Sequence, residues 1–161
     1  TGYQVQTATD SSFTKNVKTY TVSGASKTAS NYTNGKKYYV RVRAYKTVSG
    51  TKYYSAWSGK KSTYCLSAPS ISSLKNVKTK KMTVKWSKNS KATGYQIQYS
   101  TSSSFSNYKT VTVTSYKTVS KTISKLTKKK KYYVRVRAYK TVSGTKYYSA
   151  WSGNKSVKIS K

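Results

Sequence analysis

Residues 131–153 read KYYVRVRAYKTVSGTKYYSAWSG, and residues 37–59 repeat these letters without a change. Upstream of the two copies, GYQVQ at 2–6 is matched by GYQIQ at 94–98, and Phe13 is matched by Phe105. Internal similarity of this kind is the sequence signature of an array of related structural units. Identity over so long a stretch favours a recent duplication, and we expect further repeats in the parent protein.

The repeated stretch alternates apolar and polar side chains with a period of two. In YYVRVRAY (132–139), valines alternate with arginines, and the same period appears in KMTVKW (81–86) and GYQIQY (94–99). A period of two is typical of half-buried β-strands, and short strands separated by Ser, Thr, Asn and Gly predict an all-β sandwich. The alternation predicts four buried side chains, Tyr95, Ile97, Val134 and Val136. It predicts four side chains on the outer faces, Gln96, Gln98, Arg135 and Arg137.

The two repeats differ at their amino-terminal ends. The second begins with SISSL and KMTVKW, within residues 70–86, before it reaches GYQIQ, whereas the first starts directly at GYQVQ. The one proline, Pro69, precedes the longer repeat. We therefore expect a partial unit over residues 1–65 and a complete unit over residues 66–161.

The composition argues against catalysis. The chain has 33 Lys and Arg, one acidic residue (Asp10), one cysteine (Cys65) and no His, for a formal net charge of +32. General acid–base and nucleophilic catalysis usually require His or carboxylates, and metal sites require several Cys, His, Asp or Glu. We predict no enzymatic activity, no cofactor and no metal site. Cys65 is interpreted as a small half-buried apolar side chain. No apolar run approaches the ~20 residues of a membrane span.

Taken in order, these motifs resemble a fibronectin type III module, in the Lys- and Tyr-rich form found in tandem in secreted and surface proteins of Gram-positive, especially clostridial, bacteria. Trp86 falls where the family has its core tryptophan of strand B, and GYQIQY matches strand C. Leu126 and Tyr132 match the corner between strands E and F, where a tyrosine hydroxyl ties the loop back. YSAWS at 148–152 resembles the WSxWS-like box of strand G.

The resemblance implies a fibronectin-III-like antiparallel β-sandwich in tandem repeat, with sheets A-B-E and C-C′-F-G. The first unit would then contain strands C to G and lack strands A and B. Its core would be open, and we expect the natural protein to continue N-terminally and supply the missing strands.

Two groups of basic residues are candidate sites. The first, the Arg–aromatic face, comprises Arg41, Arg43, Tyr45, Trp57, Arg135, Arg137, Tyr139 and Trp151. The second is a run in one loop: Lys128, Lys129, Lys130 and Lys131. Basic and aromatic side chains interleaved on a sheet are suited to a polyanion or a sugar. The alternative, implied by the resemblance, is a structural ladder of Arg side chains between strand-G aromatic rings, and we favour it for the Arg–aromatic face.

The lysine excess points to anionic partners. A surface adapted only for solubility mixes both signs, with a net charge of about 2–8. A charge of +32 makes the folded state repel itself, and polyanions relieve that repulsion. We expect non-specific binding of wall teichoic acid, acidic glycans or nucleic acid.

Three functions stay open from the sequence, since fold resemblance does not choose among them. One is a structural spacer or adhesion unit, with a basic surface, of an extracellular or cell-surface bacterial protein. The second is a dedicated polyanion binder. The third is an accessory module of an extracellular enzyme whose catalytic domain lies elsewhere.

Overall fold

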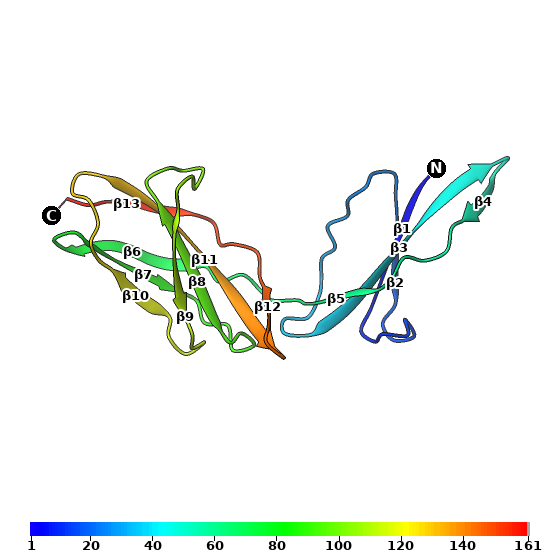
Figure 1. The fold of residues 1–161 in the computed structure, drawn as a ribbon, viewed down its shortest axis with the longest axis horizontal. Coiled ribbons are helices and arrows are strands. Elements are labelled where there is room, and N and C mark those ends of the chain that lie inside the picture. The colour runs from blue at the N-terminus through cyan, green and yellow to red at the C-terminus, as the bar shows by residue number, and fades with distance from the viewer. Residues whose placement is uncertain (161) are drawn as a thin grey trace. The chain divides into compact units, whose positions relative to one another are not determined.

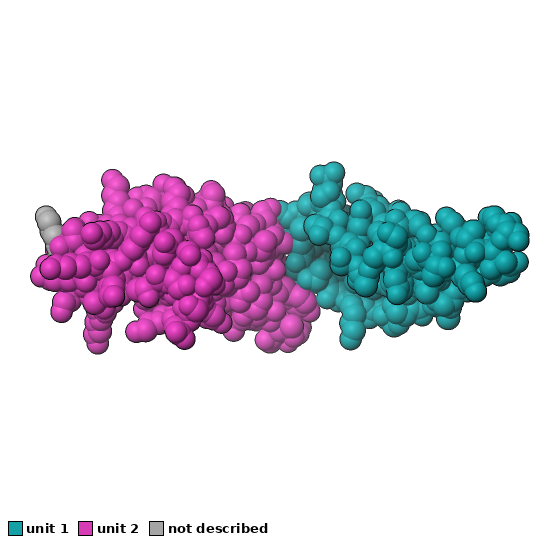
Figure 2. Space-filling model, turned by 90° about the horizontal axis from the view of Figure 1, so that it is seen from above, with its two compact units in different colours: residues 1–65 teal, residues 66–161 magenta. Residues whose placement is uncertain are grey.

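The computed structural model describes residues 1–160, which form antiparallel strands joined by turns and loops (Figure 1). The chain divides into two compact units, Thr1–Cys65 and Leu66–Lys161, coloured separately in Figure 2. We call them unit 1 and unit 2.

Unit 2 is a sandwich of two antiparallel sheets. The smaller sheet has the order β10-β7-β6, formed by Ser120–Ile123, Lys81–Trp86 and Ile71–Lys78. The larger sheet has the order β12-β11-β8-β9, and β13 also pairs with β11. Its strands are β8 (Gly94–Ser100), β9 (Lys109–Val113), β11 (Lys131–Val142), β12 (Thr145–Tyr148) and β13 (Lys155–Lys158). The predicted all-β sandwich is confirmed.

The core of unit 2 lies where the apolar faces of its two sheets meet. Tyr95, Ile97, Val134 and Val136 are each 0% exposed, as the alternation predicted. Trp86 from β7 is buried as well, and its ring centroid lies 5.4 Å from that of Tyr95 in an edge-to-face arrangement. Strand β7 thus brings a large aromatic side chain against the opposite sheet, where aromatic pairs add to the free energy of burial.

A tyrosine fixes the corner that leads into β11. The Tyr132 hydroxyl accepts a hydrogen bond from the backbone N–H of Thr127 at 3.1 Å. Leu126 beside it is buried, and its N–H donates to the Lys80 carbonyl in the turn between β6 and β7. The predicted tie between this tyrosine and its loop is confirmed. Unit 1 repeats it, with Tyr38 accepting from the N–H of Thr33 at 3.1 Å.

Unit 1 is a single sheet. Its order is β2-β1-β3-β4, and β5 also pairs with β3. The strands are β1 (Gly2–Ala8), β2 (Lys18–Val22), β3 (Lys37–Val48), β4 (Thr51–Tyr54) and β5 (Lys61–Tyr64). They correspond to the larger sheet of unit 2, and residues 1–65 hold no counterpart of β6 and β7.

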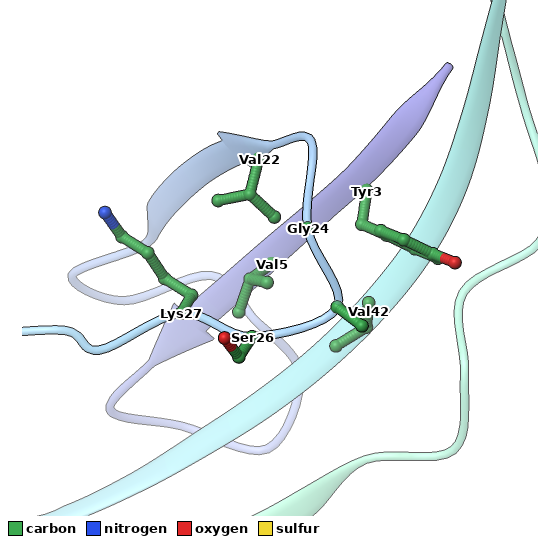
Figure 3. Close-up of a pocket in the computed structure, with 8 residues that line it drawn as sticks. Tyr3, Val5, Val22, Gly24, Ser26, Lys27 and Val42 are labelled. Atoms are coloured by element: carbon green, nitrogen blue, oxygen red, sulfur yellow. The ribbon is translucent and has the colours of Figure 1, made fainter.

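Without the second sheet, the apolar face of unit 1 stays open. Tyr3 is 40% exposed, whereas its counterpart Tyr95 is 0% exposed. A groove of about 350 Å³ lies on this face, and Figure 3 shows Val5 and Val42 on neighbouring strands beside the segment that carries Ser26 and Lys27. Near-identical sequence therefore gives a closed core in one unit and a groove in the other.

The prediction of a strand E in unit 1 was wrong. SKTI at 120–123 forms β10 in unit 2 because it pairs with β7, with Ile123 opposite Met82. The related letters SKTA at 26–29 form no strand. A backbone segment becomes a strand only when a partner accepts its hydrogen bonds, and unit 1 lacks that partner.

Candidate functional site

Five side chains on the outer face of the larger sheet of unit 2 form a stack of alternating rings and guanidinium groups. The Arg135 guanidinium carbon lies 4.1 Å from the Phe105 ring centroid and 4.7 Å from that of Trp151. The Arg137 guanidinium carbon lies 4.4 Å from Trp151 and 3.8 Å from Tyr148. We call this stack, Phe105–Arg135–Trp151–Arg137–Tyr148, the cation–π ladder. The predicted intercalation of arginines between aromatic rings is present.

Glutamines of the neighbouring strand β8 hold the edges of both guanidinium groups. Gln98 Oε1 accepts from Nε and Nη2 of Arg135 at 3.0 and 2.7 Å. Gln96 Oε1 accepts from the same two nitrogens of Arg137 at 3.1 and 2.8 Å. The register of β8 and β11, with Gln98 opposite Arg135 and Gln96 opposite Arg137, makes both contacts direct. The cation–π ladder is therefore fixed by hydrogen bonds as well as by stacking.

Two serines attach the tryptophan segment to β11. Ser149 Oγ accepts from the N–H of Ala138 at 2.9 Å, and Ser152 Oγ accepts from the N–H of Val136 at 3.0 Å. The N–H groups of the same serines donate to the carbonyls of Ala138 and Val136. Trp151 lies between these anchors, so its ring is held over the two arginines. The spacing of the serines in YSAWS thus has a geometric reason.

Unit 1 contains the same arrangement. The Arg41 guanidinium carbon lies 4.2 Å from the Phe13 ring centroid and 4.5 Å from that of Trp57. The Arg43 guanidinium carbon lies 4.4 Å from the Trp57 ring centroid and 3.8 Å from that of Tyr54. Gln6 and Gln4 hold Arg41 and Arg43 as Gln98 and Gln96 do in unit 2. The cation–π ladder forms here although the opposite face of the sheet is open. It is thus a property of the single sheet.

The prediction that Gln98 lies on the outer face is confirmed, whereas the assignment of Tyr139 to an accessible Arg–aromatic face needs correction. Gln98 is on the outer face but only 6% exposed, because Arg135 lies over it. Tyr139 is 2% exposed, and its hydroxyl lies close to Gly94, the residue opposite it in the register. A side chain at Gly94 would meet the Val113 carbonyl and the Tyr139 hydroxyl. Tyr139, and half-buried Tyr45 over Gly2, therefore fill space that glycine leaves open.

The arginines of the cation–π ladder are partly desolvated. Burial lowers the pKa of Arg137 from its ordinary value, and neighbouring Arg135 lowers it further. Arginine nevertheless stays protonated in proteins. The alternation predicted which face these arginines occupy, but it did not indicate that Phe105 and the glutamines complete the stack. Phe13 and Phe105 lie at the same distance after GYQVQ and GYQIQ in the two repeats, and this was the one sequence signal for the phenylalanines. Ligand binding by the Arg–aromatic face stays a prediction.

The lysine run lies in the loop that enters β11. Lys128, Lys129 and Lys130 are exposed, and exposed Lys131 begins the strand. The backbone here is fixed to the carboxyl-terminal segment, since Lys129 N–H donates to the Ile159 carbonyl and Ile159 N–H donates to the Lys130 carbonyl. These lysines extend from an ordered loop at one end of unit 2, away from the cation–π ladder's tryptophan.

The one acidic side chain of the sequence, Asp10, does not neutralise the lysine charges. Asp10 accepts hydrogen bonds from the backbone N–H groups of Ser12, Thr14 and Lys15 and from the Thr14 hydroxyl. These bonds, above all that from Lys15, lower the pKa of Asp10 to about 2. Its negative charge therefore stabilises a turn of unit 1. The basic surface has to find its counter-ions in solution.

Residues 1–160 contain no cluster of three or more Cys, Asp, Glu or His that could hold a metal ion. The same residues contain no helix of the length and apolar character that crossing a membrane requires.

Comparison with known proteins identifies the family. The fibronectin type III domain matches residues 67–152. The crystal structure of chicken CNTN1 FN1-FN3 domains is similar, with a TM-score of 0.50 and 20% identity, over 99% of this chain and 54% of that chain. This chain thus spans about half the length of that structure. A structure described as a myokine matches with a TM-score of 0.49 and 18% identity, over 59% of this chain and 98% of that chain.

No curated protein matched the sequence. The family match covers the two sheets of unit 2 up to Ser152, and the structure of the chicken CNTN1 domains shares the fold. The chain belongs to the fibronectin type III domain family.

Proposed function

We propose that the chain is a non-catalytic structural or adhesion module of an extracellular or cell-surface protein, and that its basic surface binds anionic polymers. Fibronectin type III domains commonly serve as structural or adhesion modules and are usually found in extracellular or surface proteins. The resemblance to Lys- and Tyr-rich repeats of Gram-positive bacteria makes wall teichoic acid one candidate polymer, beside acidic glycans and nucleic acid.

The observation that carries the proposal is the unopposed charge. The formal net charge is +32, and the sole acidic side chain is engaged by the backbone of its own turn. Surface lysines attract a linear polyanion mainly by releasing its condensed counter-ions, which requires no shaped pocket. The arginines, in contrast, are held by rings and glutamines in both units. We therefore assign polymer binding to the lysines and a structural role to the cation–π ladder.

A panel of polymers tests the proposal. Teichoic acid, heparin and double-stranded DNA should bind the chain at low salt, and neutral dextran should not, because charge and not sugar chemistry drives the interaction. A dedicated binder would instead bind one polymer much more tightly than the others, and substitution of Trp151 would abolish that binding. Binding of dextran with the same affinity as heparin would contradict the proposal.

A further inference from the structure

Lysines from two separate loops of unit 2 border one hollow. It measures about 620 Å³ and is lined by Lys80, from the turn between β6 and β7, and by Lys125, Leu126, Thr127 and Lys128, from the loop before β11. Leu126 is buried, and its N–H donates to the Lys80 carbonyl at 3.0 Å, so a backbone hydrogen bond joins the two loops. We call this feature the lysine hollow.

A smaller hollow of about 140 Å³ adjoins it. Its lining includes Lys125 and Leu126 again and adds Lys109 at the start of β9. Lysines from three segments of the chain thus surround adjoining depressions at one end of unit 2. Residues 66–160 contain no Asp or Glu, so no acidic side chain of this unit lies beside these charges.

The backbone at the lysine hollow has an unusual conformation for lysine. Lys80 and Lys125, which line the hollow, and Lys129, which follows the lining residue Lys128, have φ angles of 55°, 60° and 64°, and no other lysine in residues 1–160 has a positive φ. The left-handed region is unfavourable for residues with a Cβ, and Gly and Asn adopt it most readily. Backbone strain of this kind often marks a functional position.

Unit 1 shows how the same loop is built without lysine. At the positions equivalent to Lys125 and Lys129, it has Asn31 (φ 62°) and Gly35 (φ 82°), the residues that favour this conformation. At the position of Lys128 it has Asn34. Both loops have positive φ angles at these two positions, so the fold does not require lysine there. Stability alone would favour the unit 1 residues, and a different advantage has to explain the lysines of unit 2.

We propose that the lysine hollow binds a phosphate group, with Lys80, Lys125 and Lys128 as its cationic contacts. The lysine ammonium is a compact charge with three donors and is a common phosphate ligand. The inference rests on the proposed function, since a phosphate-bearing polymer is one class of anionic polymer. It adds a discrete site in unit 2 that unit 1 lacks, at an end of the unit remote from the Gly94 end of β8.

The test is a calorimetric titration of the full chain with inorganic tripolyphosphate and, separately, with inorganic phosphate, at about 0.15 M salt, where exposed charges are screened. The site variant carries Lys125→Asn and Lys128→Asn, the residues of unit 1. The control carries Lys91→Asn and Lys117→Asn, which remove the same charge near the opposite end of unit 2. If inorganic phosphate alone saturates the site, its ligand is free phosphate. If only tripolyphosphate binds, its ligand is a chain of phosphates. Both outcomes support the hollow as a phosphate site.

Wild type and control should bind tripolyphosphate alike, and the site variant should bind about tenfold more weakly or worse, as expected when charge-assisted hydrogen bonds are lost. The thermal midpoint of the site variant should equal or exceed that of the wild type, because asparagine accepts the left-handed backbone. Lys80→Asn, in the other loop, should weaken binding as well. It tests the site independently in case the double variant fails to fold.

Equal losses in site variant and control would overturn the lysine hollow while leaving non-specific polyanion binding intact. A wild-type chain that binds polyanionic polymers but not tripolyphosphate would also overturn it. A wild-type chain that binds no anionic polymer at low salt would contradict the proposed function itself, so the two failures are distinguishable.

Discussion

Replacement of Trp151 by leucine tests whether the cation–π ladder stabilises the fold or serves as a ligand-binding face. The substitution keeps an apolar side chain and removes the ring that lies 4.7 and 4.4 Å from the guanidinium carbons of Arg135 and Arg137. Each cation–π contact at a partly exposed site contributes about 0.5–1 kcal/mol. Loss of both should lower the free energy of unfolding of unit 2 by about 1–2 kcal/mol. The midpoint of thermal unfolding should fall by several degrees, since 1 kcal/mol corresponds to about 4–8 °C in a domain of this size.

Circular dichroism during thermal and urea denaturation measures the effect on the full chain. Tyr108→Leu is the matched control, because Tyr108 is an aromatic residue of the same unit that is 51% exposed. In a background with Arg135→Gln and Arg137→Gln, the Trp151 substitution should cost less, and the difference is the coupling energy. Equal effects of the Trp151 and Tyr108 substitutions, or no coupling to the arginines, would refute a structural role and favour ligand binding on this face.

Three further predictions concern the two units and their turns. Tyr95→Ala removes a buried aromatic side chain and should destabilise unit 2 by about 3–5 kcal/mol, whereas Tyr3→Ala at the open position should cost less than about 1 kcal/mol. Similar losses for the two variants in urea denaturation would contradict the open core of unit 1. Tyr132→Phe should cost about 1 kcal/mol by removing the acceptor of the Thr127 N–H, measured the same way, and no loss would count against the corner. Folding lowers the pKa of Asp10 to about 2, so its stabilisation is complete above about pH 4 and is lost as the pH falls toward 2. Thermal midpoints should therefore fall with acid in the wild type and not in Asp10→Ser, and a parallel fall in both would contradict this role.

Local alternation predicted most of the fold. The period of two in 132–139 assigned Val134 and Val136 to the core and Arg135 and Arg137 to the outer face, and all four assignments are confirmed. The corner tyrosine was implied by the resemblance to the fibronectin type III family, through the motif of Leu126 and Tyr132. These features depend on residues close together in the chain, so the sequence pattern contains them.

The features that depend on distant partners were predicted less well. Alternation says which face of a sheet a side chain occupies, but it does not say whether another side chain covers it. It assigned Gln98 to the outer face correctly, yet both Gln98 and Tyr139 are covered by neighbouring groups and buried. Strand E of unit 1 was predicted from similarity to its counterpart, yet a strand needs a paired neighbour. The left-handed lysines Lys80, Lys125 and Lys129 carry no local signal, because lysine does not favour that conformation.

The salt dependence of DNA binding tests the proposed polyanion-binding function most directly. A footprint of roughly six lysines predicts a slope of about −5 for log K against log salt concentration, since each neutralised phosphate contributes about −0.9. Affinity should then fall on the order of a thousandfold between about 50 and 200 mM salt, with little preference for DNA sequence. Fluorescence anisotropy of labelled duplexes at several salt concentrations gives this slope. A slope near zero, with tight binding retained at the higher salt concentration, would contradict binding through diffuse lysine contacts.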